Sequence, residues 1–206
     1  PLMVNEMLWA MGMTTIVQCY AVRGLEVVAA QNISSTITNL FNIVYIQLGA
    51  SIAIVVGQLL GAGKLKEARD ADNKMIFFVV TACIGMSVLM SAFGGLFPQI
   101  YNTEDTIKEL ATKFIFISAM LMPVHAFCHS TYFTLRSGGK TVVTFLFDSG
   151  YLWVIMVPVA FVLSRFTSIP LLPMYFIVQC SEIFKAVVGT VLVVKKVWVN
   201  NIVEEM

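Results

Sequence analysis

The sequence predicts an all-α integral membrane protein, folded as a single bundle of six transmembrane helices over residues 1–206. Hydrophobic residues make up 58% of the 206 residues and charged residues only 12%, about half the share that soluble domains carry. The apolar residues also gather into six stretches long enough for a helix to cross the hydrocarbon core, about 20 residues each. The strict alternation of a membrane β-strand is absent from these stretches, so helices are the expected spanning element.

Turn residues mark where each predicted helix ends. The spans run over residues 2–22, 27–60, 74–97, 107–135, 142–163 and 171–194. Glycine and proline interrupt the helical pattern between them, at Arg23-Gly24, Gly61–Lys64, Phe97-Pro98, Ser137–Lys140 and Ser164–Pro170. The second and fourth spans exceed one crossing, which predicts that they tilt or extend beyond the membrane. The alternating charges of residues 63–73 predict a short amphipathic helix with a solvated charged face.

Basic residues predict the orientation of the bundle. The second and fourth turns and the C-terminal tail lie on one side of the membrane, and the other turns lie opposite. Because cytoplasmic loops carry an excess of Lys and Arg, both ends of this segment are predicted to be cytoplasmic, in the cell membrane. The basic residues of the predicted cytoplasmic side are Lys64, Lys66, Arg69, Lys74, Arg136, Lys140, Lys185, Lys195 and Lys196, against Arg23, Lys108, Lys113 and Arg165 on the other side.

Several other classes of protein are disfavoured. A basic cluster with interleaved aromatic residues, which would indicate nucleic-acid binding, is missing. The motifs of serine hydrolases, zinc peptidases and Walker ATPases are missing too, so we predict neither an enzyme nor a cofactor. The four cysteines lie in apolar stretches without a C-x-x-C pair, which favours packed thiols over a metal site.

Glu6 is the first ionisable residue that lies inside a predicted membrane span, where burying a charge costs free energy. A charge at the bilayer centre costs about 2.5–3.5 kcal/mol on insertion scales, so it indicates function. A buried carboxylate exchanges a proton or binds a small cation. The alternative is an interfacial Glu that is solvated or paired with a loop cation. Helical spacing places on one face Glu6, Ala10, Met13, Val17 and Tyr20.

The second span carries a polar stripe of about three turns. Asn32, Ser35, Asn39 and Asn42 follow one another at spacings of three, four and three. Such a stripe must face protein or water rather than lipid. A substrate cavity and hydrogen bonding to a neighbouring helix are both consistent with it.

Titratable residues also occur in the later spans. His125 and His129 lie four residues apart on the fourth span, and without an acidic partner at helical spacing they do not predict a metal site. Imidazole titrates near neutral pH, which favours a proton-exchanging or substrate-facing pair, with helix packing as the alternative. Asp148 is expected to anchor the fifth span, and Glu182 is expected to pair with Lys185 three residues later.

Short motifs occur in a characteristic order along the whole chain. They are Asn5-Glu6, Trp9 and Gly12; Gly57-Gln58 and Gly61-Ala62-Gly63; Leu135-Arg136-Ser137-Gly138-Gly139-Lys140-Thr141; Asp148, Trp153 and Pro158; and Glu182, Lys185, Gly189, Trp198 and Asn200-Asn201. In order and spacing these motifs resemble the C-terminal lobe of multidrug and toxic compound extrusion (MATE) transporters.

The resemblance implies one lobe of a twelve-helix transporter whose two six-helix lobes enclose a substrate cavity. The N-terminal lobe, missing from this chain, is then an expected partner, together with the lipid bilayer and a small-molecule substrate. The implied activity is cation-coupled export of small, often cationic organic compounds or drugs. The coupling ion, H⁺ or Na⁺, stays open. The alternatives are a flippase of lipid-linked precursors and a membrane fragment that does not transport.

The resemblance also assigns roles to residues. Glu6 matches the acid of the family's seventh helix, and His125 stands near the position of an acid on the tenth. Both are expected to take part in cation coupling, although a histidine there puts a carboxylate sodium site in doubt. The residues expected to line the substrate cavity are Asn5, Trp9, Met13, Tyr20, Asn32, Ser35, Asn39, Asn42 and His129.

Overall fold

Glycine turns separate the long helices of the computed structural model, which describes residues 2–199. Gly24, Gly63 and Gly139 adopt positive φ angles, which glycine tolerates without steric cost. Within residues 2–199 all regular structure is helical. The elements are α1 (Leu2–Ala21), α2 (Leu25–Gly61), α3 (Leu65–Gly94), η1 (Phe97–Ile100), α4 (Asp105–Ser137), α5 (Thr141–Phe145), η2 (Leu146–Gly150), η3 (Leu152–Met156), α6 (Val157–Phe166) and α7 (Leu171–Val194).

The six predicted spans are found as helices, and five of them are long and apolar enough to cross a membrane. By length and composition, five helical segments can cross a membrane: α2, α3, α4, the stretch from Thr141 to Phe166, and α7. Helix α1 has 20 residues but is less apolar, since it carries Asn5, Glu6 and Gln18. The six-helix, all-α architecture is therefore confirmed, and α1 is the one long helix among the described residues that falls short of a membrane span by composition.

The start of α3 corrects the prediction for residues 63–73. These residues do not form a separate helix with a fully solvated face, because α3 runs without a break from Leu65. Ala68 and Asp72 are buried, and they lie on the same helical stripe as buried Val79 and Cys83. The core-facing stripe of the span therefore continues into the charged segment.

The fifth span is one helical stretch with two π-helical segments, η2 and η3. Pro158 follows directly, in the first turn of α6. Proline cannot donate a backbone hydrogen bond inside a helix. Carbonyl groups in the preceding turn therefore lose their usual amide donor and pair with the next one along the chain, as in a π-helix. π-Segments of this kind often occur at functional sites.

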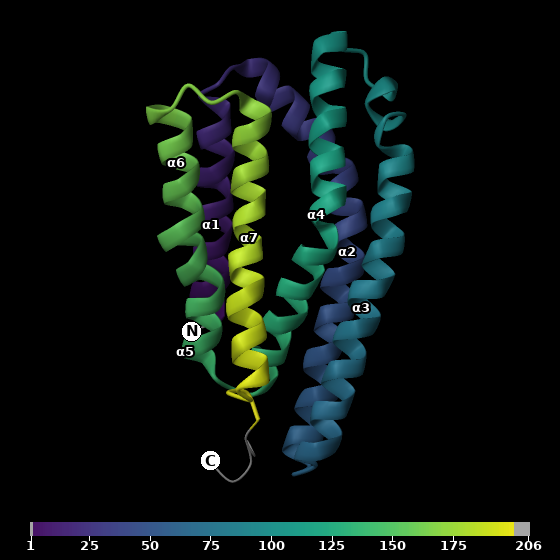
Figure 1. Cartoon of the computed structure of the whole chain (residues 1–206), viewed down its shortest axis with the longest axis vertical. Helices are drawn as coiled ribbons and strands as arrows, with labels where there is room; N and C mark the ends of the chain where they lie inside the picture. The colour runs from purple at the N-terminus through teal and green to yellow at the C-terminus, as the bar shows by residue number, and fades with distance from the viewer. Residues whose placement is uncertain (1, 200–206) are drawn as a thin grey trace.

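Helix α4 connects the two sides of the bundle (Figure 1). It packs with α2, α3 and α7, and after a change of direction its second part passes behind α7 and reaches α5. Pro123 lies inside α4 and accounts for the bend. Close approach to α2 depends on Gly49, because a Cβ atom there would lie 2.7 Å from Cδ2 of Phe133.

The turns lie at the two ends of the bundle in the grouping that the sequence predicts. The start of α1, the end of α7, the α2–α3 turn and the α4–α5 turn lie toward the same end (Figure 1). The other three connections lie at the opposite end. That the first end faces the cytoplasm stays a prediction from the charge bias.

Candidate functional site

A buried polar network centres on Asn5 of α1, whose residue surface is only 2% exposed. Its Nδ2 donates to Asp148 Oδ2 at 3.2 Å and lies 3.4 Å from the hydroxyl of Tyr132. Ser149 Oγ lies 2.7 Å from Asn5 Oδ1 and 2.9 Å from the Asn5 backbone oxygen. Asn5 therefore ties α1 to α4 and to η2 inside the lobe.

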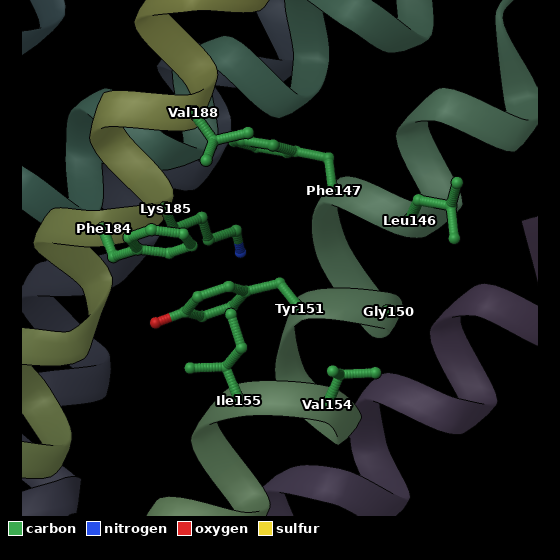
Figure 2. A pocket seen from close by; sticks show the side chains of 9 residues that line it. All are labelled: Leu146, Phe147, Gly150, Tyr151, Val154, Ile155, Phe184, Lys185 and Val188. Carbon is green, nitrogen blue, oxygen red and sulfur yellow. The ribbon is translucent and has the colours of Figure 1, made fainter.

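The centre of this network holds an ion pair between η2 and α7. Lys185 Nζ lies 3.0 Å from Asp148 Oδ1, and the two side chains are only 9% and 12% exposed. The ammonium group also lies 5.4 Å from the ring centroid of Phe147 and 5.6 Å from that of Tyr151. Figure 2 shows Lys185 reaching between these two rings. Pairing with Glu182, expected from the sequence, is replaced by pairing across helices.

Glu6 stands at the open edge of the network. The hydroxyl of Tyr132 donates to Glu6 Oε1 at 3.1 Å, while the Glu6 side chain is 59% exposed. Arg136 Nη1 lies 3.7 Å from the same oxygen and is 37% exposed, so this pair is weak. A continuous polar chain thus leads from Lys185 through the network to an accessible carboxylate.

The predicted face of α1 is only partly open. Glu6, Ala10 and Val17 are exposed, Met13 is half-buried, and neighbouring Trp9 is 37% exposed. Tyr20 departs from the prediction, because it is 2% exposed and its ring lies 5.4 Å from that of Tyr175 on α7. Tyr20 belongs to the packed core and does not line an open surface of the lobe.

The polar stripe of α2 lies at the surface of the lobe along much of its length. Asn32 and Asn39 are exposed, whereas Ser35 and Asn42 are half-buried. Ser35 Oγ donates to the backbone oxygen of Asn32 at 3.0 Å. In the part of the chain that the structure describes, the stripe makes no side-chain hydrogen bond to another helix. Hydrogen bonding within the lobe therefore does not account for it.

The two histidines follow the bend of α4 and are both half-buried. The His129 ring lies 5.0 Å from the ring of Tyr45 on α2. Between them, Cys128 Sγ lies 3.5 Å from the backbone oxygen of Glu182, so this part of α4 packs on α7. This segment of α4 therefore contacts α2 through His129 and α7 through Cys128.

A cavity of about 280 Å³ opens beside the ion pair, between the η2–η3 stretch and α7 (Figure 2). Its walls are almost entirely apolar, apart from the Lys185 chain. The lining residues are Leu146, Phe147, Gly150, Tyr151, Val154, Ile155, Phe184, Lys185 and Val188.

Asp72 is a buried acid that the sequence-based interpretation missed. Its residue surface is 0% exposed, and its Oδ1 accepts a hydrogen bond from Thr134 Oγ1 at 2.6 Å. Its Oδ2 has no hydrogen-bond partner among the described residues. The spacing of four residues from Ala68 could have placed it on the buried stripe.

The comparison with protein families identifies the chain. A family model described as MatE matches residues 1–162, well over half of the 206 residues. The chain belongs to the MatE family. Together with its span-like helices, this membership makes it an integral membrane protein.

The fold of this MatE chain is also seen in a solved structure. A structure titled "Crystal structure of MATE in complex with MaL6" matches with a TM-score of 0.83 at 13% sequence identity. The match covers 93% of this chain and 44% of that one. The chain thus has the fold of one lobe of a MATE transporter and spans somewhat less than half of the solved protein's length.

Proposed function

We propose that this MatE chain forms the C-terminal lobe of a cation-coupled antiporter, which exports small, often cationic organic compounds across the cytoplasmic membrane. Family membership and the lobe fold support a transporter of the MATE type rather than an enzyme. An N-terminal lobe would supply the other wall of the substrate cavity. The coupling ion is H⁺ or Na⁺.

The position of Glu6 is the observation that carries this proposal. Its carboxylate is open to solvent at one end and held by Tyr132 at the other. When it binds a proton or sodium it becomes neutral, and its enclosure by the closing cavity is then tolerated. When bare it is costly to enclose, and it attracts a cationic compound. Because the coupling ion and the organic cation exclude each other from the Glu6 carboxylate, the transport of one is coupled to the transport of the other.

The exposed polar residues of α2 support a substrate-facing surface. Asn32 and Asn39 lie in a membrane helix and lack partners on other helices among residues 2–199. Lipid does not satisfy such amides, whereas an aqueous cavity does. A flippase for anionic lipid-linked precursors would need a cationic cavity, but Lys185 is already neutralised by Asp148.

Transport by a Glu6→Gln variant of the complete protein tests the proposal. Efflux of a fluorescent organic cation from vesicles is measured under an imposed pH gradient and, separately, a sodium gradient. We expect loss of gradient-driven efflux at an unchanged membrane level. The matched control is Glu26→Gln, an exposed acid in the first turn of α2, which should transport normally. Full gradient-driven efflux by Glu6→Gln would refute the role of this carboxylate.

A further inference from the structure

The cavity beside the ion pair has no part in the proposed function. It measures about 280 Å³ and lies between the η2–η3 stretch and α7 (Figure 2). Gly150 forms part of the η2 wall. The atoms nearest to a Cβ atom added there belong to Phe145 and Leu146 of the same stretch, at 3.4 Å or more. The missing side chain therefore leaves a gap that α7 does not fill.

The mouth of the cavity opens on an apolar surface. Two exposed apolar side chains flank it on each wall, Leu146 and Val154 on the η2–η3 stretch, and Phe184 and Val188 on α7. Along the whole of α7 the exposed residues are apolar except Thr190, whose hydroxyl donates to the backbone oxygen of Ala186 in the same helix. In a membrane protein such a face suits lipid, because it presents no polar side chain without a partner.

Water and organic cations are poor occupants of this cavity. A buried water makes about three hydrogen bonds to polar groups, whereas these walls are almost entirely apolar and the Lys185 ammonium is already held 3.0 Å from Asp148. The same ammonium lies beside the rings of Phe147 and Tyr151, so it repels a second cation from them. A hydrocarbon chain needs no polar partner and gains dispersion contacts with both walls.

A lysine lies on the same face of α7 as the cavity wall. Phe184, Val188, Val191 and Lys195 follow one another at spacings of four, three and four, so they form one stripe along the helix. Val191 and Lys195 are both exposed. Lys195 directly follows the last residue of α7 and lies about 10 Å along the helix from Val188. The stripe therefore leads from an apolar wall to a cation at the end of a membrane helix, where lipid phosphate groups lie.

We propose that this cavity binds one acyl chain of a membrane phospholipid, whose phosphate group pairs with Lys195. The chain completes the wall between the η2–η3 stretch and α7, and it keeps water away from the ion pair of Asp148 and Lys185. Lipid tails are as apolar as the lining residues, so binding comes from the packing of a chain into a concave gap. The site requires only that the protein lies in a membrane, and it is independent of cation coupling at Glu6.

Photo-crosslinking of the complete protein in phosphatidylcholine vesicles tests the acyl-chain site. The probe is a phosphatidylcholine with a diazirine in one acyl chain, and mass spectrometry maps the labelled residues. We expect residues 146–155 and 184–188 to be labelled more strongly than the exposed face of α3. Gly150→Leu fills the cavity and should abolish this excess. The matched control is Gly85→Leu, at an exposed glycine of α3 with open space around it, which should keep the excess.

A second probe tests the phosphate contact. A diacylglycerol with the same labelled chain lacks the phosphate group, so its labelling of the cavity walls should not depend on Lys195. Lys195→Gln should weaken the labelling by the phosphatidylcholine probe alone. The control Lys74→Gln, at an exposed lysine of α3 near the same end of the bundle, should leave both probes unchanged. Equal labelling by the phosphatidylcholine probe in wild type and Lys195→Gln would refute the phosphate contact.

Three results would overturn the acyl-chain site. They are the absence of excess labelling in wild type, excess labelling that persists in Gly150→Leu, and displacement of the label by an exported organic cation, which would make the cavity a substrate site. Should Gly150→Leu fail to reach the membrane, Val188→Phe narrows the mouth from α7 and gives the same test. Efflux by Glu6→Gln is measured separately, so the lipid site and the proposed function can fail independently.

Discussion

Replacing Lys185 with Met tests the energetic weight of the buried ion pair. Met keeps the length and packing of the chain but removes the charge, so Asp148 loses its counterion inside the lobe. Breaking a buried pair on one side typically costs about 3–5 kcal/mol. The low exposure of both side chains, 9% and 12%, places this pair in that class. The interaction with the rings of Phe147 and Tyr151, about 0.5–2 kcal/mol, is lost as well.

The double variant Asp148→Asn with Lys185→Met should recover much of this loss. An amide at position 148 still accepts the hydrogen bond that Asn5 donates, and the unpaired charge is gone. The two positions are therefore coupled, and we expect the double variant to be about 2–4 kcal/mol more stable than Lys185→Met alone, because a loss of about 3–5 kcal/mol falls to about 1 kcal/mol. The remaining loss, about 1 kcal/mol, reflects the missing cation–π contact.

Denaturant unfolding in detergent micelles, carried through the full double-mutant cycle, measures this coupling. The exposed pair Lys113–Glu109 is the matched control, because its distance is 2.6 Å while its side chains are 48% and 69% exposed. Lys113→Met should cost less than about 1 kcal/mol. If Lys185→Met costs no more than Lys113→Met, or if the two changes at 148 and 185 simply add, the reasoning is wrong.

Two further changes test the packing at the end of the bundle that holds the α2–α3 and α4–α5 turns. Asp72→Leu should leave the free energy of unfolding unchanged or raise it by about 1–3 kcal/mol. The substitution removes an unpaired buried oxygen, and Thr134 keeps a backbone acceptor in its own helix. A measured loss of stability above about 1 kcal/mol would count against this. Gly138→Ala should destabilise the folded protein by about 1–3 kcal/mol, because the added Cβ atom would clash with the backbone oxygen of Trp198. The control Gly57→Ala places its Cβ atom in open space and should stabilise α2 by about 0.5–1 kcal/mol. Equal melting temperatures for the two glycine variants would contradict the clash.

The helices were predictable from the sequence because their two signals are local. The length of each apolar run and the glycines of the turns placed most helix ends within a few residues. The start of α3 was misplaced because composition was given more weight than periodicity. Asp72 looked like part of a solvated charged run, although its spacing from Ala68 matches the buried stripe. The motif residues Asn200-Asn201 lie outside the described residues.

The site was predictable only in part, since its contacts join distant segments. Asn5 and Glu6 stood out from the sequence because polar residues are rare in such a span. The partner of Lys185 did not, because Asp148 belongs to a π-helical segment that a sequence pattern does not reveal. Tyr20 was placed on an open face because helical spacing says which residues share a side, but not which side α7 covers.

The ammonium group of Lys185 is a counterion attached to the backbone of α7. A free ion leaves its site when its concentration in the surrounding water falls, whereas a tethered one stays at a constant local concentration. Asp148 therefore keeps its partner at any sodium concentration, and burial protects the pair from screening by salt. The consequence is that Asp148 is permanently paired and holds the helices together, so on the proposed function the exchangeable cation binds at Glu6 and not at Asp148.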